Sequence, residues 1–235
     1  MRLLFPRVHQ ATRRLLRRIG YEVRETEQGC CGALHAHNGH LGEAQEHAKK
    51  LIHSMPEDLP VIVNSAGCGS TMKEYGDLLG GAPDGPEWLY AKRVFDISEF
   101  LAAHGLLEKL KDAQGLETAV TYHDACHLAH GQRIKQSPRT LIEAIPSISF
   151  VELPEADRCC GSAGVYNVTQ PVFARELLSQ KWANVVSTGA EIVATGNPGC
   201  HAWIEQAARE HGATVRVLHT AELLEAAFVG LQHFA

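Results

Sequence analysis

Apolar positions along this chain alternate between two patterns, one typical of amphipathic helices and one typical of short, buried strands. The segment 6–19 carries Val8 and Leu15 on one side and several arginines on the other, which predicts an opening helix. Helices are predicted at 6–19, 43–54, 70–79, 88–104, 138–145, 171–187, 200–210 and 221–229. Strands are predicted at 21–24, 60–64, 118–122, 149–152, 192–195 and 214–218. The segments 29–42 and 158–164 are predicted as loops.

Strands that alternate with helices indicate an α/β fold with mostly parallel sheets. A polar, charged stretch at 105–117 divides the chain, and the order of elements after it repeats the order before it. We therefore expect two tandem Rossmann-like modules related by internal duplication, at 1–110 and 111–235. Sites in such folds lie beyond the carboxyl ends of the strands, so residues directly after the predicted strands are the first candidates.

Composition narrows the class of protein. The formal net charge is −5, so the chain lacks the basic surface that binds nucleic acid nonspecifically. No apolar run approaches the roughly 18 residues of a membrane span. The cationic start MRLLFPRVHQATRRLLRR lacks the apolar stretch of a signal peptide. We expect a cytoplasmic protein whose thiols stay reduced and are free to bind metal.

The seven cysteines fall into two similar groups, each with a Cys-Cys-Gly sequence followed by a single cysteine. The first group is Cys30, Cys31 and Cys68, and the second is Cys126, Cys159, Cys160 and Cys200. The interval from the pair to the following single cysteine is similar in the two groups. The flanking sequences Ser-Ala-Gly-Cys at 65–68 and Asn-Pro-Gly-Cys at 197–200 also correspond. These matches indicate an internal duplication with a period of about 130 residues.

Only the second group opens with an extra cysteine, because Cys126 precedes its Cys-Cys pair. The same interval, counted back from Cys30, leads to position −3, just before Met1. We therefore expect that Met1 is an internal methionine of a longer protein, or that the chain is a fragment. On this interpretation the second module is complete, and the first lacks its opening strand and its first cysteine.

Four thiolates from three loops suit a soft metal centre, either zinc or an iron–sulfur cluster. Zinc sites favour cysteines with two to four residues between them, whereas adjacent cysteines can bind different irons of one cluster. The glycines beside the cysteines would let the backbone approach the cluster and donate N–H groups to sulfur. These glycines are Gly32, Gly67, Gly161 and Gly199. Buried structural thiols are the remaining alternative.

The arrangement Cys-x(32)-Cys-Cys-Gly-x(38)-Cys resembles the cysteine-rich CCG module. This module occurs in tandem at the C-terminal end of the iron–sulfur subunits of glycolate oxidase. It also occurs in related lactate-utilisation proteins and in heterodisulfide reductase subunits. The resemblance covers nearly the whole chain and is closest to the glycolate oxidase subunit. It rests on LFPRVHQATRRLL, GCCGALHAHNGH, NSAGCGSTMKEYG, YHDACHLAHGQ, RCCGSAGVYNVTQP and GNPGC.

The resemblance implies a [4Fe–4S] cluster and electron transfer by a non-catalytic subunit of an oxidase complex. The cluster ligands of the second module would be Cys126, Cys159, Cys160 and Cys200. The first module would hold an incomplete set, which binds a second, solvent-ligated cluster or none, at Cys30, Cys31 and Cys68. FAD-containing glycolate oxidase subunits would oxidise the 2-hydroxy acid and pass electrons through this chain toward quinone. An L-lactate-oxidising complex is an alternative, and the location would be cytoplasmic or peripheral at the inner face of the cytoplasmic membrane.

Two departures from the family bear on function. The family's ferredoxin-like Cys-x2-Cys-x2-Cys region is missing from this sequence, so a separate ferredoxin-like segment is an expected partner. The heterodisulfide branch ends its motif in Cys-x-x-Cys, but Thr71 and Trp203 stand at the last position here. The missing thiolate disfavours thiol–disulfide oxidoreduction, which we keep as the alternative.

Histidines are frequent around the cysteines, among them His35, His37, His40, His123, His127, His130 and His201. We expect most of them to form hydrogen bonds around the site rather than to bind metal directly. The dipeptide His123-Asp124 directly before Cys126 is expected to hold that loop.

Overall fold

The computed structural model describes residues 4–25, 29–56 and 58–234. Its larger sheet lies in the second half of the chain and has four parallel strands in the order β4-β3-β5-β6. These strands are β3 (Thr118–His123), β4 (Ile148–Phe150), β5 (Ile192–Thr195) and β6 (Arg216–His219). Their register aligns Val120 with both Phe150 and Ile192, so the carboxyl ends of β3 and β5 lie side by side.

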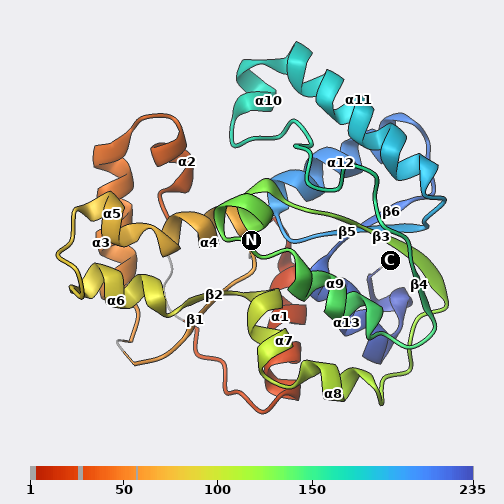
Figure 1. Ribbon diagram of the computed structural model, residues 1–235, viewed down its shortest axis with the longest axis horizontal. Coiled ribbons are helices and arrows are strands. Elements are labelled where there is room, and N and C mark those ends of the chain that lie inside the picture. The colour runs from red at the N-terminus through yellow and green to blue at the C-terminus, as the bar shows by residue number, and fades with distance from the viewer. Residues whose placement is uncertain (1–3, 26–28, 57, 235) are drawn as a thin grey trace.

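Helices cover both faces of the larger sheet (Figure 1). On one face, α11 (Pro171–Ser187) and α12 (Pro198–Glu210) pack against Val193 and Val217. On the other face, α9 (Gln136–Glu143) and α13 (Thr220–Val229) pack against Val120. Because both faces are buried, the central strand β5 carries the continuous apolar run Ile-Val-Ala, as is common in parallel sheets. The predicted α/β class with parallel sheets is confirmed.

The smaller sheet pairs β1 (Val61–Val63) with β2 (Val94–Asp96), again in parallel. Four helices pack around a separate apolar cluster on this side of the molecule (Figure 1). They are α3 (Leu41–Ser54), α4 (Ala66–Lys73), α5 (Tyr75–Leu79) and α6 (Pro86–Lys92). The partly buried Ile62 and Phe95 pack instead against the main core, which includes α7 (Ile97–Ala103). The remaining short elements are α2 (Ala33–His37), α8 (Leu106–Leu110), α10 (Tyr166–Thr169), the π-helix η1 (His127–Gly131) and the 3-10 helix η2 (Leu231–Phe234).

The internal duplication is visible in two strand–helix junctions. In the first half, Asp96 ends β2 and caps α7, with Glu99 completing a capping box. In the second half, His219 ends β6 and caps α13, with Glu222 completing the same box. The side chain of each cap residue accepts a hydrogen bond from the backbone, and the glutamate accepts one from the cap's N–H. The two halves therefore share this capping arrangement as well as a parallel strand pair, β1-β2 in the first and β5-β6 in the second.

Several predicted elements are shifted or wrong. Residues 21–24 form no strand. The corresponding strand of the second half, β4, is an edge strand that pairs only with β3. Among the described residues, no strand lies beside 21–24 with which this segment could pair in the same way. The segment 88–104 is not a single helix, because β2 interrupts it. The helix predicted from Ser70 or Thr71 begins already at Ala66, and the predicted loop 29–42 contains α2.

One apolar core crosses the predicted boundary between the halves. Helices α1 (Pro6–Arg18), α7 and α8 contribute to the cluster that also contains the strands of the larger sheet and α13. Leu15 of α1 and Leu106 of α8 are fully buried in it. The guanidinium of Arg14 lies 3.3 Å from the buried carboxylate of Glu225, which ties α1 to α13. The division at residue 110 stays a prediction, and the two halves share their main core.

Candidate metal centre

The second group of cysteines comes together at the carboxyl end of the larger sheet. Cys126 follows β3 and stands at the start of η1, whereas Cys200 lies in the first turn of α12, after β5. The pair Cys159-Cys160 lies on the loop between β4 and α10. Parallel strands bring the segments that follow them to one edge, which is why residues far apart in sequence meet here. All of these cysteines are free thiols.

Each of the four thiols interacts electrostatically with the next in the order Cys126, Cys159, Cys160 and Cys200. In the contacts Cys126–Cys159 and Cys160–Cys200, the proton is favoured on one sulfur and the negative charge on the other. These contacts lower the pKa of Cys159 and Cys200 and raise the pKa of Cys126 and Cys160. Sulfurs that compete for protons at a mostly buried position are a suitable donor set for a soft cation, so these residues fit a soft metal centre.

Neutral donors surround the thiolates. The N–H of Gly161 lies 3.3 Å from Cys159 Sγ, and the side-chain amide of Asn197 lies 3.5 Å from Cys200 Sγ. Such donors stabilise negative charge on sulfur. The sequence did not lead us to expect Asn197 as a hydrogen-bond donor to sulfur. Its position three residues before Cys200, at the N-cap of α12, is the feature that could have indicated this role.

His123 points to the same place. Its side chain is fully buried, and neither ring nitrogen has a hydrogen-bond partner among the described residues. A ring nitrogen lies within 4.8 Å of the sulfurs of Cys160 and Cys200. The predicted role of His123-Asp124 in holding the loop before Cys126 therefore falls to Asp124, and the ring of His123 faces the thiol group, where it lowers the pKa of Cys200.

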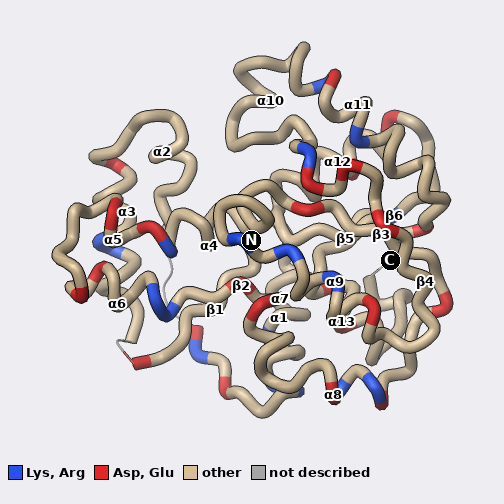
Figure 2. Tube along the Cα trace, in the orientation of Figure 1, with Lys and Arg blue, Asp and Glu red and all other residues tan. Residues whose placement is uncertain are grey.

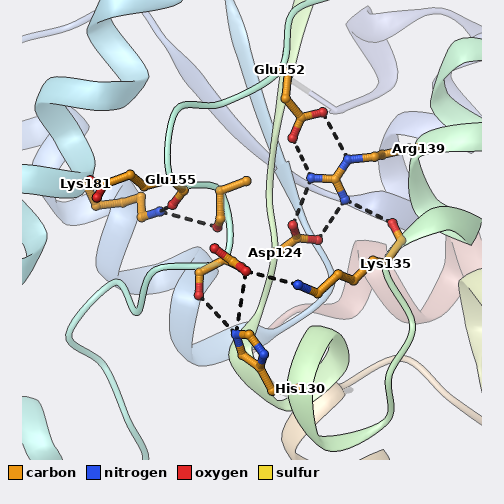
Figure 3. A network of polar contacts seen from close by, with 9 residues as sticks. Asp124, His130, Lys135, Arg139, Glu152, Glu155 and Lys181 are labelled. Atoms are coloured by element: carbon orange, nitrogen blue, oxygen red, sulfur yellow. Dashed lines mark hydrogen bonds and ion pairs between the residues drawn. The ribbon is translucent and has the colours of Figure 1, made fainter.

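Asp124 does hold that loop (Figure 3). Its carboxylate is 3% exposed and binds both terminal nitrogens of Arg139 at 2.9 and 2.8 Å. Arg139 also binds Glu152 beyond β4, and these contacts raise the pKa of its guanidinium. The network fixes the segment that carries Cys126 against the start of the loop that carries the cysteine pair. No local pattern in the sequence marked Arg139.

A buried lysine supports the loop of the cysteine pair. Lys181 of α11 is 1% exposed, and its ammonium donates to the backbone oxygens of Glu155 and Ala156 at 2.6 and 3.3 Å (Figure 3). Burial lowers the pKa of this lysine. The positive charge therefore lies against the loop, and carbonyl oxygens rather than a carboxylate satisfy its hydrogen bonds.

The glycines after the Cys-Cys pairs donate to sulfur, as expected, and they also allow close packing against a helix. Each donates its N–H to the first sulfur of its pair, at 3.4 Å for Gly32 and 3.3 Å for Gly161. Both have positive φ, +79° and +93°, which favours glycine. The space where a side chain would stand is filled by helix backbone, at Ala44 of α3 and Ala174 of α11. The absent side chain thus lets each loop pack against the following long helix.

The first group is similar but more open. Cys31 is buried, and its interactions with Cys30 and Cys68 raise its pKa. The same contacts lower the pKa of Cys30 to about 5 and that of Cys68 to about 7. Cys30 is exposed, and the backbone oxygen of Cys31 accepts a hydrogen bond from the Tyr75 hydroxyl at 2.7 Å. The structure brings these three thiols together as well.

The two groups adjoin a common seam between the halves. The N–H of Gly67 donates to Asn197 Oδ1 at 3.2 Å, and the N–H of Ala66 donates to the backbone oxygen of Gly196. Across the same seam the rings of His37 and His127 stack with centroids 4.8 Å apart. The residues before each single cysteine therefore bind one another.

The segments around both Cys-Cys pairs carry no charge. Residues 29–42 and 159–174 contain no Lys, Arg, Asp or Glu, and the regions of α2 and α10 are accordingly uncoloured in Figure 2. Several apolar side chains in or beside them are exposed by half or more, namely Leu34, Leu41, Val168, Val172 and Phe173. Elsewhere charges of both signs are interspersed along the trace.

Within the described ranges, none of the helices combines the length and the apolar character needed to cross a membrane. The model of the CCG cysteine-rich domain matches residues 1–73 and 120–205, which include all seven cysteines.

Curated proteins similar to this chain include three of different kinds. A probable glycolate oxidase iron–sulfur subunit of Bacillus subtilis is 37% identical, over 95% of this chain and 52% of the relative. Lactate utilization protein A of Oceanobacillus iheyensis is 32% identical, over 94% of this chain and 91% of the relative. A fumarate reductase (CoM/CoB) subunit of Methanothermobacter marburgensis is 32% identical, over 95% of this chain and 44% of the relative. The chain thus spans about half the length of the first relative.

Proposed function

This chain belongs to the family of CCG cysteine-rich domain proteins, and from that premise we propose that it is an iron–sulfur electron-transfer subunit of a complex that oxidises a 2-hydroxy acid. The observation that carries the proposal is the meeting of Cys126, Cys159, Cys160 and Cys200 as free thiols at one sheet edge. The names of the glycolate oxidase and lactate utilization relatives support this assignment.

We propose that these four cysteines hold a [4Fe–4S] cluster, which supplies one-electron transfer when bound. The chain's own part is to hold and tune that group. Asn197 and the N–H of Gly161 donate to ligand sulfurs, while Asp124 and Arg139 fix the loop of Cys126. Hydrogen bonds to sulfur and burial are the means by which a protein sets a cluster's potential.

Iron and sulfide fit this set better than zinc does. Two of the ligands, Cys159 and Cys160, are adjacent, a spacing that structural zinc sites rarely use. The first module offers only Cys30, Cys31 and Cys68 in this sequence, so we propose that it binds a solvent-ligated cluster or none.

The proposed partner is an FAD-containing subunit that oxidises the hydroxy acid, with quinone as the final acceptor. A ferredoxin-like segment would supply further centres. The uncharged surface around α2 and α10, with exposed Val172 and Phe173, supports contact with a partner subunit, since desolvating it costs little. We propose a location in the cytoplasm or at the inner face of the cytoplasmic membrane.

The substrate of the complex is either glycolate or lactate. Glycolate is favoured by the higher identity to the glycolate oxidase relative, and L-lactate by the match to nearly the full length of lactate utilization protein A. Reduction of a disulfide is less well supported, because the fifth cysteine of that chemistry is replaced by Thr71 and Trp203, and both side chains are buried.

The test is the metal and sulfide content of the chain purified without oxygen. We expect iron and acid-labile sulfide in near-equal amounts, with a strong decrease in Cys160→Ser. The matched control is Cys31→Ser, the corresponding residue of the first module, which should leave the second-module cluster in place. Zinc without sulfide in the wild-type chain would overturn the proposal.

A further inference from the structure

The first module contains a second kind of ligand group beside its thiols. The sulfur of Cys30 and ring nitrogens of His35 and His47 all lie within 4.8 Å of one another. They come from the loop before α2, from α2 and from α3, and these two helices pack together. This group of three, which we call the Cys–His–His group, places three good ligands for transition metals around one point.

The rings of His35 and His47 lie against each other beside Cys30. Their ring centroids are 4.8 Å apart, with an interplanar angle of 40°. The Nδ1 atom of His35 is buried and has no hydrogen-bond partner among the described residues. Both histidines are half-buried, whereas Cys30 is exposed. A buried ring nitrogen without a partner is costly unless something else satisfies it, and a metal ion would do so.

The second module lacks this arrangement. Cys159 corresponds to Cys30, and the positions equivalent to His35 and His47 are Gly164 and Glu176. Cys159 is instead in contact with the thiol of Cys126. The two imidazoles are therefore a property of the first module alone, and the duplication itself does not require them.

We propose that Cys30, His35 and His47 bind a single divalent transition-metal ion of the Zn²⁺ type, with water as the fourth ligand. Two nitrogens and one sulfur match the preference of Zn²⁺, and three protein ligands with an open position are a known zinc arrangement. This proposal adopts the alternative in which the first module, including Cys30, binds no cluster. It rests on the proposed function in one respect, namely that iron and sulfide are bound by the second module. A bound ion would fasten the first Cys-Cys loop to α2 and α3.

The test uses the full chain with its second-module cluster loaded, stripped of other metals by a chelator and titrated anaerobically with Co²⁺. We expect one Co²⁺ per chain, with tetrahedral ligand-field absorption and a thiolate-to-cobalt charge-transfer band. His35→Gln and His47→Gln should each weaken binding by about 100-fold or more, since even loss of a group behind a ligand costs about 10–100-fold. Cys30→Ser should abolish the charge-transfer band.

The matched control is His53→Gln, on the same helix α3, where the exposed ring contacts the backbone oxygen of Lys49. It should bind Co²⁺ as the wild-type chain does. Equal binding by the wild type and the His35 and His47 variants would overturn the proposal. So would extra iron and sulfide in the first module that disappear in His47→Gln, because the histidine would then serve a cluster. Iron and sulfide in the second module, measured on the same samples, test the proposed function separately.

Discussion

The side-chain oxygen of Asn197 accepts a hydrogen bond from the backbone N–H of Gly67 at 3.2 Å, so a residue beside one cysteine group binds a residue beside the other. The same amide donates to the sulfur of Cys200 at 3.5 Å. One side chain thus connects the halves and contacts the candidate metal centre.

We expect Asn197→Ala to lower the free energy of unfolding by about 1–3 kcal/mol, because a partly buried N–H and a thiolate lose their partner. Urea denaturation of the metal-free chain measures this loss. Asn38→Ala is the matched control, since it removes a single exposed hydrogen bond to Leu34 and should cost clearly less. Equal losses for both variants would contradict the role assigned to Asn197.

Arg139→Met should be among the most damaging single substitutions outside the cysteines. It leaves the buried carboxylate of Asp124 without its partner, and breaking a buried pair in this way costs about 3–5 kcal/mol. The exposed Lys135 is the control, because Lys135→Met removes only a surface ion pair to Asp157 and should cost under about 1 kcal/mol. In the double variant Asp124→Asn and Arg139→Met, the two losses should be less than additive. Simple additivity would rule out the coupling.

Gly161→Ala should destabilise the loop of the second Cys-Cys pair more than backbone strain alone explains. Gly189 also has a positive φ, +66°, but a side chain there would meet nothing within 4 Å. Gly189→Ala should therefore cost only the strain, about 1–2 kcal/mol. Gly161→Ala adds an overlap with the backbone of Ala174. Thermal unfolding of the two variants measures the difference, and the same melting temperature in both would refute the packing role.

We expect the buried ring of His219 to lower the stability of the folded chain in mild acid. Burial lowers the pKa of its ring from 6.5 to about 3 in the folded chain. The unfolded chain therefore binds the extra proton between these values, and stability falls as pH decreases below 6.5, by up to about 1.4 kcal/mol per pH unit. His219→Asn keeps an N-cap acceptor for α13 but cannot titrate. Urea titrations at pH 7 and pH 5 should show a smaller acid loss in the variant. Identical losses would exclude His219 as the cause.

For Asp96, the corresponding cap residue of the first half, we expect the opposite dependence of folding stability on pH. Burial raises the pKa of its carboxyl from 3.8 to about 6. In that window the folded chain holds the extra proton, so this residue's contribution falls as pH rises from about 4 toward 6. Asp96→Asn retains the cap for α7 and removes the titration. The variant, followed by urea denaturation, should therefore gain relative to the wild type as pH rises through this range. A constant difference would contradict the assignment.

Much of the fold was predictable because strong local patterns determine it. The apolar run of β5 and the proline-started α11 were predicted with the bounds that the structure has, and the order of strands and helices in the second half was correct. The strand predicted at 21–24 failed because a strand needs a neighbour, and hydrophobic pattern alone does not supply one. The short β2 was missed because its three residues run directly into α7.

The cysteines of the candidate site were predictable from their repeat, and their supports were not. Spacing and the strand-end rule brought the thiols to one edge. Arg139 lies 15 residues from the carboxylate that it binds, and Asn197 lies 130 residues from Gly67. Such contacts depend on tertiary packing, for which a single sequence offers no local signal. The ring of His123 was likewise expected to hold the loop before Cys126, and it faces the thiols of Cys160 and Cys200 instead.

The packing of α1 against α13 has a consequence for how the protein is made. Arg18 ends α1 and Thr220 begins α13, so nearly the whole described chain separates the two helices. Roughly 200 residues made at about 5–20 residues per second leave the earlier helix waiting about 10–40 s before its partner exists. Until then α1 can pack only against α7 and α8, and the part of its apolar stripe that meets α13 stays uncovered. Helix α1 leaves the ribosome first, and it completes its packing only after α13 has been synthesised.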